Sequence, residues 1–124
     1  MSSRSRGTEG ERKAAEYLRR HGYTLLATNF RSARAEIDIV ATKGERVVFV
    51  EVKYWKALAA RDLEYSINPR KQRRIRQASQ YFIHKHPEFE NAQVGFDVIL
   101  VSEPGSRITH YENAFEAVGL DSVG

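Results

Sequence analysis

Residues 36–53 read EIDIVATKGERVVFVEVK, in which two apolar runs flank the polar segment 42–45. Each run is rich in β-branched side chains and too short for a typical helix, so each is predicted to be a strand. The polar segment contains Gly44, which favours a turn between the runs. The stretch is therefore predicted to be a β-hairpin with arms at about 36–41 and 46–54.

A helix is predicted before this hairpin. Thr8 and Glu11 have the spacing of a capping box, small and apolar residues then recur at helical intervals, and Gly22 is a stop signal. The helix is expected to run from about Thr8 to His21.

A second helix is predicted after the hairpin, because Asn68 can cap it and Pro69 suits its first position. Pro87 is expected to end it. The order of elements is then α-β-β-β-α-β, and the predicted fold class is α/β, a mixed central β-sheet flanked by helices. The remaining strands are expected at about 23–30, 94–101 and 108–111.

The composition suits a folded domain with a polyanionic partner. The 124 residues are 41% hydrophobic and 29% charged, which is ordinary for a globular protein. The absence of cysteine excludes disulfides, thiolate metal sites and cysteine nucleophiles. No apolar run is long enough for a membrane span or a signal peptide, so a cytoplasmic location without membrane association is expected. The net charge of +4 is mild evidence for a polyanionic partner.

Two acidic residues and a lysine are expected on one face of the hairpin. Side chains alternate along a strand, so Glu51 and Lys53 share a face, and Asp38 lies beside Glu51 if the arms pair. Two carboxylates in a partly buried place repel each other, and Mg²⁺ or Mn²⁺ would remove that conflict through oxygen ligands. Such a cation activates water, and Lys53 would orient that water or stabilise charge on a phosphate. The alternative is a solvated face with a cross-strand ion pair.

The two arms together resemble the Asp…Glu-x-Lys signature of the restriction-endonuclease-like superfamily. More closely, the chain from Gly7 to Phe115 resembles the YraN-type family of small uncharacterised bacterial proteins, which is related to archaeal Holliday-junction resolvases. The resemblance implies a restriction-endonuclease-like fold. Further matching pieces are Gly10-Glu11, 68–74, 96–98 and 112–115.

The resemblance also implies a role for each matching residue. Asp38 and Glu51 would be metal ligands, the Val52 carbonyl a third ligand, and Lys53 the catalytic lysine. Glu11 matches an acid on the first helix of resolvase-like members.

Two of these assignments have alternatives. Glu11 either belongs to the site or only completes the capping box with Thr8. Gln72 is the candidate for the superfamily's polar residue on the helix after the lysine strand, and Gln77 competes with it.

The chain is expected to divide into a flexible basic N-terminal arm, a nuclease-like domain and a C-terminal tail. The limits of these parts are 1–7, 8–118 and 119–124. A homodimer is implied by the resemblance, because cleavage of a junction needs two active sites.

A basic cluster at the start of the second helix is predicted to contact DNA phosphates. Cations there oppose the helix macrodipole, whereas guanidinium groups bind phosphate oxygens well. Two arginines in the loop before Asp38 extend the cluster, and the alternative is a solvated basic face. The expected contacts are Arg70, Lys71, Arg73, Arg74, Arg31 and Arg34.

Other polar and aromatic residues are read as structural. Tyr54-Trp55 either stacks on an unpaired base or, as we prefer, packs partly buried. Asp97 lies in an apolar strand and is either a group that supports the site residues or, as we prefer, a structural buried acid paired with an arginine. The four histidines show no convincing ligand partner.

These observations favour a metal-dependent phosphodiesterase. It would be an endonuclease that acts on DNA, and its substrates would include branched or junction DNA. The alternative is a nucleic-acid-binding module with little or no catalysis. A third hypothesis is a protein-interaction domain whose carboxylate pair is only structural. Retention of Asp38, Glu51 and Lys53 together favours the enzyme, because a binding module needs the basic helix but not the acids.

Overall fold

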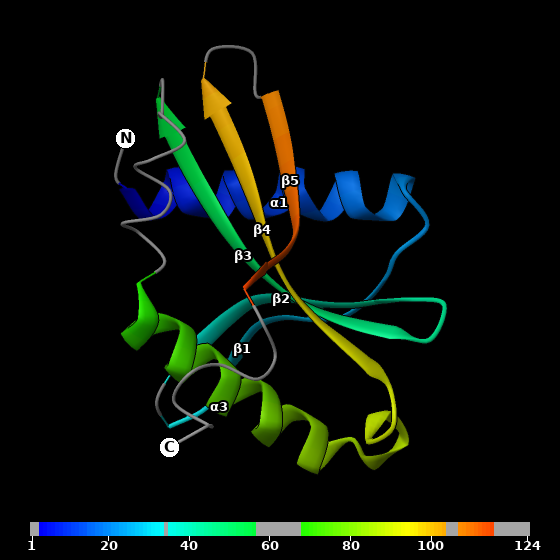
Figure 1. Cartoon of the computed structure of the whole chain (residues 1–124). Coiled ribbons are helices and arrows are strands. Elements are labelled where there is room, and N and C mark those ends of the chain that lie inside the picture. The colour runs from blue at the N-terminus through cyan, green and yellow to red at the C-terminus, as the bar shows by residue number, and fades with distance from the viewer. Residues whose placement is uncertain (1–2, 34, 57–67, 104–106, 116–124) are drawn as a thin grey trace.

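The computed structural model describes residues 3–33, 35–56, 68–103 and 107–115, which form a five-stranded sheet with a helix on each face (Figure 1). The predicted α/β fold, a mixed sheet flanked by helices, is confirmed at this level. None of the described helices is long and apolar enough to cross a membrane. The elements are α1 (Ser3–Arg20), β1 (Thr24–Arg31), β2 (Glu36–Lys43), β3 (Arg46–Lys56), α3 (Pro69–Lys85), the 3-10 turn η1 (Pro87–Phe89), β4 (Gln93–Glu103) and β5 (Arg107–Phe115).

The strands lie in chain order, β1-β2-β3-β4-β5, and only β3 and β4 are parallel. Parallel neighbours need a crossover connection, and α3 lies within that connection. The predicted hairpin is confirmed, with β2 and β3 paired from Ile39↔Val50 to Lys43↔Arg46. Gly44 has a φ of 60° in its turn, a conformation that glycine adopts without steric cost.

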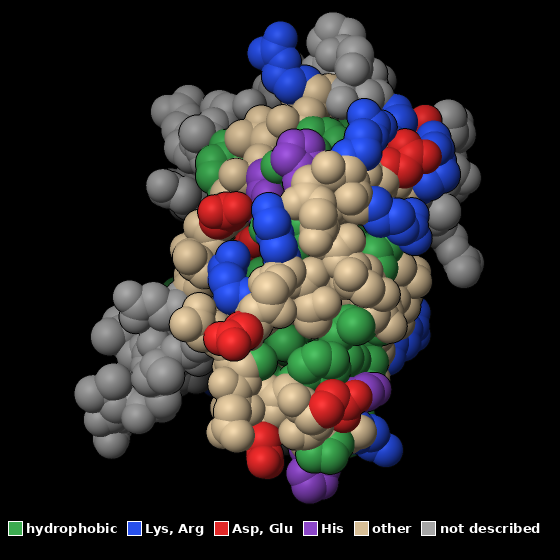
Figure 2. All heavy atoms as spheres, turned by 90° about the vertical axis from the view of Figure 1, so that its right-hand side faces the viewer, with side chains coloured by type: hydrophobic (Ala, Val, Ile, Leu, Met, Phe, Trp, Pro, Cys, Tyr) green, Lys and Arg blue, Asp and Glu red, His purple; other side chains and the backbone are tan. Residues whose placement is uncertain are grey.

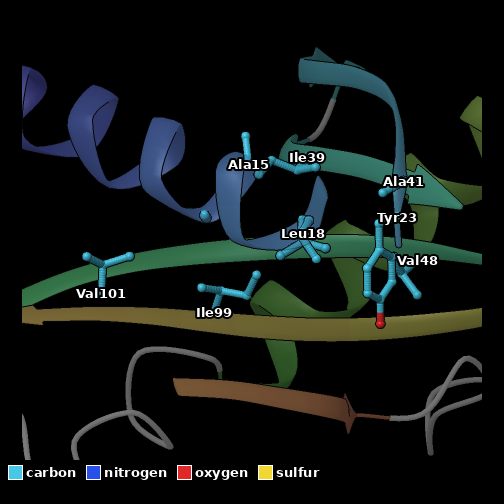
Figure 3. Packing of buried hydrophobic residues seen from close by; sticks show 10 residues of the cluster. Ala15, Leu18, Tyr23, Ile39, Ala41, Val48, Ile99 and Val101 are labelled. Atoms are coloured by element: carbon cyan, nitrogen blue, oxygen red, sulfur yellow. The ribbon is translucent and has the colours of Figure 1, made fainter. Parts of the chain in front are cut away.

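Alternation along β3 sends its side chains to two separate cores. Val48 and Val50 face α1, where Leu18 is fully buried over β3 and β4 (Figure 3). Val47 and Phe49 face α3 and pack with Phe82. Glu51 and Lys53 follow Val47 and Phe49 in the same alternation, so they emerge on the α3 side where the apolar core ends.

The start of α1 differs from the prediction. The helix begins at Ser3, not at Thr8, so part of the expected N-terminal arm is helical. Once packing at Leu18 has established a helix, each further residue adds a hydrogen bond, and no proline in 3–7 stops it. The tail at 119–124 and the domain limit at 118 lie outside the described residues.

Helix α1 approaches the sheet closely at Gly10. A Cβ at that position would lie 3.1 Å from Tyr54 Cδ2, which is a tight contact. Tyr54 packs partly buried against the core on the α1 side of the sheet, which is the position we preferred for it. The Trp55 side chain lies outside the described residues.

A buried polar cluster joins β4, β5 and α1. Asp97 is 1% exposed, lies 2.8 Å from His110 Nε2 and accepts from Asn113 N at 3.0 Å. Arg46 Nη2 lies 3.7 Å from Asp97, and the Tyr17 hydroxyl lies 3.2 Å from His110 Nδ1. The expected pairing of Asp97 with an arginine is therefore present, and His110 has a partner that the sequence did not reveal.

A candidate active site between the β2–β3 hairpin and α3

The two carboxylate-bearing strands separate at Asp38. The ladder between β2 and β3 ends at the pair Ile39–Val50, and beyond it the Asp38 carboxylate accepts a hydrogen bond from Val52 N at 2.8 Å. The side chain thus takes the place of a backbone acceptor. Because the N–H and C=O of one strand residue point to the same side, the Val52 carbonyl also faces this edge.

Glu51 is held between two ammonium groups. Its Oε1 lies 2.9 Å from Lys71 Nζ and 3.6 Å from Lys53 Nζ, and its side chain is only 11% exposed. Lys53 comes from the same strand, whereas Lys71 comes from the first turn of α3. Lys71, which the sequence placed among the phosphate contacts, therefore contacts a proposed metal ligand.

Charge is compensated unequally across the site. Burial, followed by the charge of Glu51, raises the pKa of Asp38 to about 7, and the hydrogen bond from Val52 only partly offsets this. Burial and the nearby Lys71 lower the pKa of Lys53. Burial also disfavours the Lys71 ammonium, but its contact with Glu51 outweighs this and raises the pKa of Lys71. The two lysines thus form ion pairs with Glu51 and act on Asp38 only at longer range.

Both carboxylates line one pocket of about 500 Å³, which lies between the β2–β3 hairpin and the start of α3. Asn68 begins α3 by accepting from Lys71 N at 2.9 Å, and Pro69 follows it in the first turn. The predicted cap is therefore confirmed, and it sets the basic first turns of α3 against the acids. The lining residues are Ala35, Glu36, Asp38, Glu51, Asn68, Arg70, Lys71, Arg74 and Ile75.

Glu11 lies at the border of this acidic group. With its amide nitrogen turned towards the carboxylates, Asn29 donates to Glu36 Oε1 at 2.9 Å and to Glu11 Oε2 at 3.1 Å. Burial, with the charges of Glu36 and Glu51, raises the pKa of Glu11 although Asn29 lowers it. Since α1 begins at Ser3, the capping-box explanation of Glu11 is wrong.

The other predicted residues are dispersed. Lys53 contacts Glu51 but is not among the described residues that line the acidic pocket, and neither are Gln72 and Arg73 of α3. Arg31 is an exposed side chain that pairs with Glu36 at 3.3 Å, and it lines a second pocket. Gln77, the alternative to Gln72, lines that second pocket as well. Arg34 lies outside the described residues.

The donor set limits how a metal could be held. Within the parts of the chain that the structure describes, no three His, Asp or Glu side chains are placed to hold a metal ion together. Asp38, Glu51 and the Val52 carbonyl supply oxygen donors only, which suits a hard divalent cation that keeps several waters. The residues fit Mg²⁺ or Mn²⁺ better than a softer metal.

Figure 2 shows the molecule from the right-hand side of Figure 1, opposite to the end at which α3 begins. On that face, Lys and Arg side chains lie next to Asp and Glu side chains, and hydrophobic side chains are exposed below them. Positive charge there is interspersed with negative charge, unlike the run of cations at the start of α3.

Comparison with known proteins finds similarity over most of the chain. The sequence model of a family described as "Uncharacterised protein family UPF0102" matches residues 10–101. A UPF0102 protein of Rhodopseudomonas palustris is 39% identical over 111 residues, which cover 90% of this chain and 83% of that protein. A UPF0102 protein of Bradyrhizobium is 42% identical over 111 residues, covering 90% and 79% of the two chains. One of Persephonella marina is 40% identical over 116 residues, covering 94% and 97%.

Proposed function

This chain belongs to the uncharacterised protein family UPF0102, the YraN-type family that its motifs resemble, and we propose that it is a metal-dependent endonuclease acting on DNA, including branched DNA. One observation carries the proposal. Asp38 and Glu51 share a pocket whose opposite wall is the basic start of α3. The arrangement is also compatible with the restriction-endonuclease-like fold, which is part of the proposal.

The electrostatics of Asp38 support a cation in this pocket. The pKa of Asp38 is about 7 because this carboxyl group is buried beside Glu51. Its ionisation near neutral pH therefore costs free energy. Neither lysine forms an ion pair with Asp38 among the contacts of the described residues, whereas both contact Glu51. Mg²⁺ or Mn²⁺ at Asp38, Glu51 and the Val52 carbonyl would remove this cost. When bound, the cation would supply Lewis-acid activation of water and charge neutralisation at the phosphate.

Lys53 has the position of a group that acts on the reacting phosphate. Its side chain is 17% exposed, and its Nζ lies 3.6 Å from Glu51 Oε1. A fixed positive charge on a mostly buried side chain stabilises negative charge that develops beside it in a transition state, and it needs little reorganisation to do so. We assign Lys53 to this role, or to orienting the water that attacks.

The basic wall supports binding to the nucleic-acid backbone. Arg70 and Arg74 are exposed, line the pocket and lie one helical turn apart on α3. One guanidinium group can bind two phosphate oxygens at once, and such contacts hold a strand in place without reading its sequence. The proposal therefore places the strand along α3, with one phosphate above the carboxylates.

One observation favours the alternative, a nucleic-acid-binding module with little or no catalysis. The Lys71 ammonium already lies 2.9 Å from Glu51, so Glu51 has a counter-ion without any metal. A cleavage assay with Mg²⁺, Mn²⁺ or a chelator separates the two functions. Metal-dependent cleavage supports the endonuclease, and binding without cleavage supports the binding module.

Replacing Arg74 by alanine is expected to weaken binding to all DNA sequences alike and to lower the salt dependence of binding. Each lost phosphate contact reduces the slope of log affinity against log salt concentration by about 1. Fluorescence anisotropy over a salt series measures both quantities.

Arg73→Ala is the matched control, because Arg73 lies next to Arg74 on α3 but does not line the pocket. It is expected to change the slope less. An Arg74 variant that binds like wild type at every salt concentration would remove the basic wall from the account.

A further inference from the structure

A second pocket, of about 400 Å³, lies beside the acidic one and contains an exposed aromatic ring. Tyr81 is 42% exposed, one of the two large hydrophobic residues that are exposed among the described residues. Its ring packs at 6.1 Å from that of Phe30 and has the Lys85 ammonium 5.2 Å from its centre. The lining residues are Arg31, Ser32, Ala33, Gln77 and Tyr81.

The two pockets follow each other along α3. On α3, the residues at positions 70, 74, 77 and 81 follow the helical repeat and form one stripe, of which the first two line the acidic pocket and the last two line the second. The rise of a helix separates Arg74 from Tyr81 by about 10 Å along its axis. The facing walls adjoin each other, because Arg31 at the second pocket and Glu36 at the acidic one are paired across β1 and β2 and joined by an ion pair.

We propose that the second pocket binds an unpaired nucleobase of the DNA strand whose phosphate lies at the acidic pocket. This deepens the proposed function and rests on it. A base inside a duplex is stacked on both faces, so only an unpaired base can insert its ring beside Tyr81. The Gln77 amide has the donors and acceptor needed for a base edge, and Arg31 provides a positive charge for the adjoining phosphate.

The chemistry of this pocket separates it from a general phosphate-binding surface. Phosphate contacts need only cations, whereas this pocket combines an aromatic face, an amide and a guanidinium group. Tyr54 is not available for the same purpose, because it packs against Gly10 and the α1-side core. The substrate class that follows is DNA with unpaired nucleotides a few positions from the cleaved bond.

Tyr81→Ala is expected to weaken binding to single-stranded, flap or bulged DNA by about tenfold or more, the range that stacking on an aromatic side chain supplies. Its affinity for a fully paired duplex should stay within about twofold of wild type, since no base leaves the stack. Anisotropy in the presence of a chelator measures binding without cleavage.

Two control variants keep this test specific. Tyr81→Phe retains the aromatic face and should bind like wild type. Gln80→Ala removes a neighbouring exposed side chain of α3 outside the pocket, so it controls for an unspecific change of this surface. An unchanged urea midpoint shows that the Tyr81 variants are folded. Equal losses on duplex and unpaired DNA, or no loss on either, would overturn the base pocket. Absence of cleavage by wild type, with the Tyr81 effect intact, would instead overturn the endonuclease and leave the pocket standing.

Discussion

Lys53→Ala is expected to reduce metal-dependent DNA cleavage by about 10³-fold while leaving DNA affinity within a few-fold of wild type. The Lys53 side chain is mostly buried and its ammonium lies 3.6 Å from Glu51, so its charge acts beside the carboxylates rather than on the exposed surface that holds the strand. Removing one preorganised group that stabilises transition-state charge costs about 10²–10³-fold in rate, and loss of water orientation adds to this. Binding should depend instead on the exposed arginines of α3.

The matched variants for this prediction are Lys53→Met and Lys43→Ala. Methionine keeps the length of the stem without the charge, so it tests whether the charge rather than the packing matters. Lys43 is an exposed lysine on the same hairpin, and its removal should leave the rate unchanged. Single-turnover rates at saturating protein measure the effect. A Lys53→Met protein that cleaves as fast as wild type would show that Lys53 has no part in the chemistry.

Asp38→Asn is expected to abolish cleavage and, without metal, to make the protein more stable than wild type near neutral pH. The folded state raises the pKa of Asp38 from 3.8 to about 7, so ionising this carboxyl disfavours folding. Each unit of difference corresponds to about 1.4 kcal/mol, which makes the total a few kcal/mol. Asparagine keeps an oxygen that accepts from Val52 N and carries no charge.

The pH dependence has a defined sign. Between about pH 4 and pH 7 the folded protein holds a proton at Asp38 that the unfolded chain has lost, so this group lowers the stability of the wild type as the pH rises through that window. Above about pH 7 the loss levels off. Urea unfolding of both proteins in chelator, at several pH values, gives the difference in stability between them. Saturating Mg²⁺ should restore the wild type and leave Asp38→Asn unchanged.

The free energy of unfolding of Asp38→Asn should exceed that of wild type by more as the pH rises from about 4 to about 7. A difference that stays constant over this range would contradict the electrostatic effect assigned to Asp38. So would an Asp38→Asn protein that is less stable than wild type at neutral pH. Glu36→Gln is a useful control, because Glu36 lines the same pocket but has hydrogen-bond and ion-pair partners in Asn29 and Arg31.

The hairpin and the meeting of Asp38 with Glu51 were predictable because both follow from local rules. A Gly44 turn between two β-branched runs sets the pairing, and alternation along each strand then sets which side chains share a face. The same alternation places Glu36 on the face of Asp38, so its presence in the pocket had a signal in the sequence. The separation of the strands beyond Ile39–Val50 had no such signal.

Contacts between distant elements could not be predicted in the same way. Lys71 was expected to face phosphates, but it contacts Glu51 because of how α3 docks on the sheet, and no local pattern encodes that docking. The pairing of His110 with Asp97 depends on a register between β4 and β5 that has an irregularity at Asp97. The pocket at Tyr81 had no signal in the sequence, because it forms only where Arg31, Ser32 and Ala33 lie against α3.

The endonuclease activity is tested by cleavage of labelled single-stranded, duplex, flap and four-way-junction DNA by wild type and Glu51→Gln, with Mg²⁺, Mn²⁺ or chelator. Wild type is expected to cleave only with a divalent cation and to prefer the DNAs that contain unpaired nucleotides. Glu51→Gln should bind these DNAs without cleaving them. Wild-type protein that binds DNA but cleaves none of the four with either cation would contradict the account and identify a binding module.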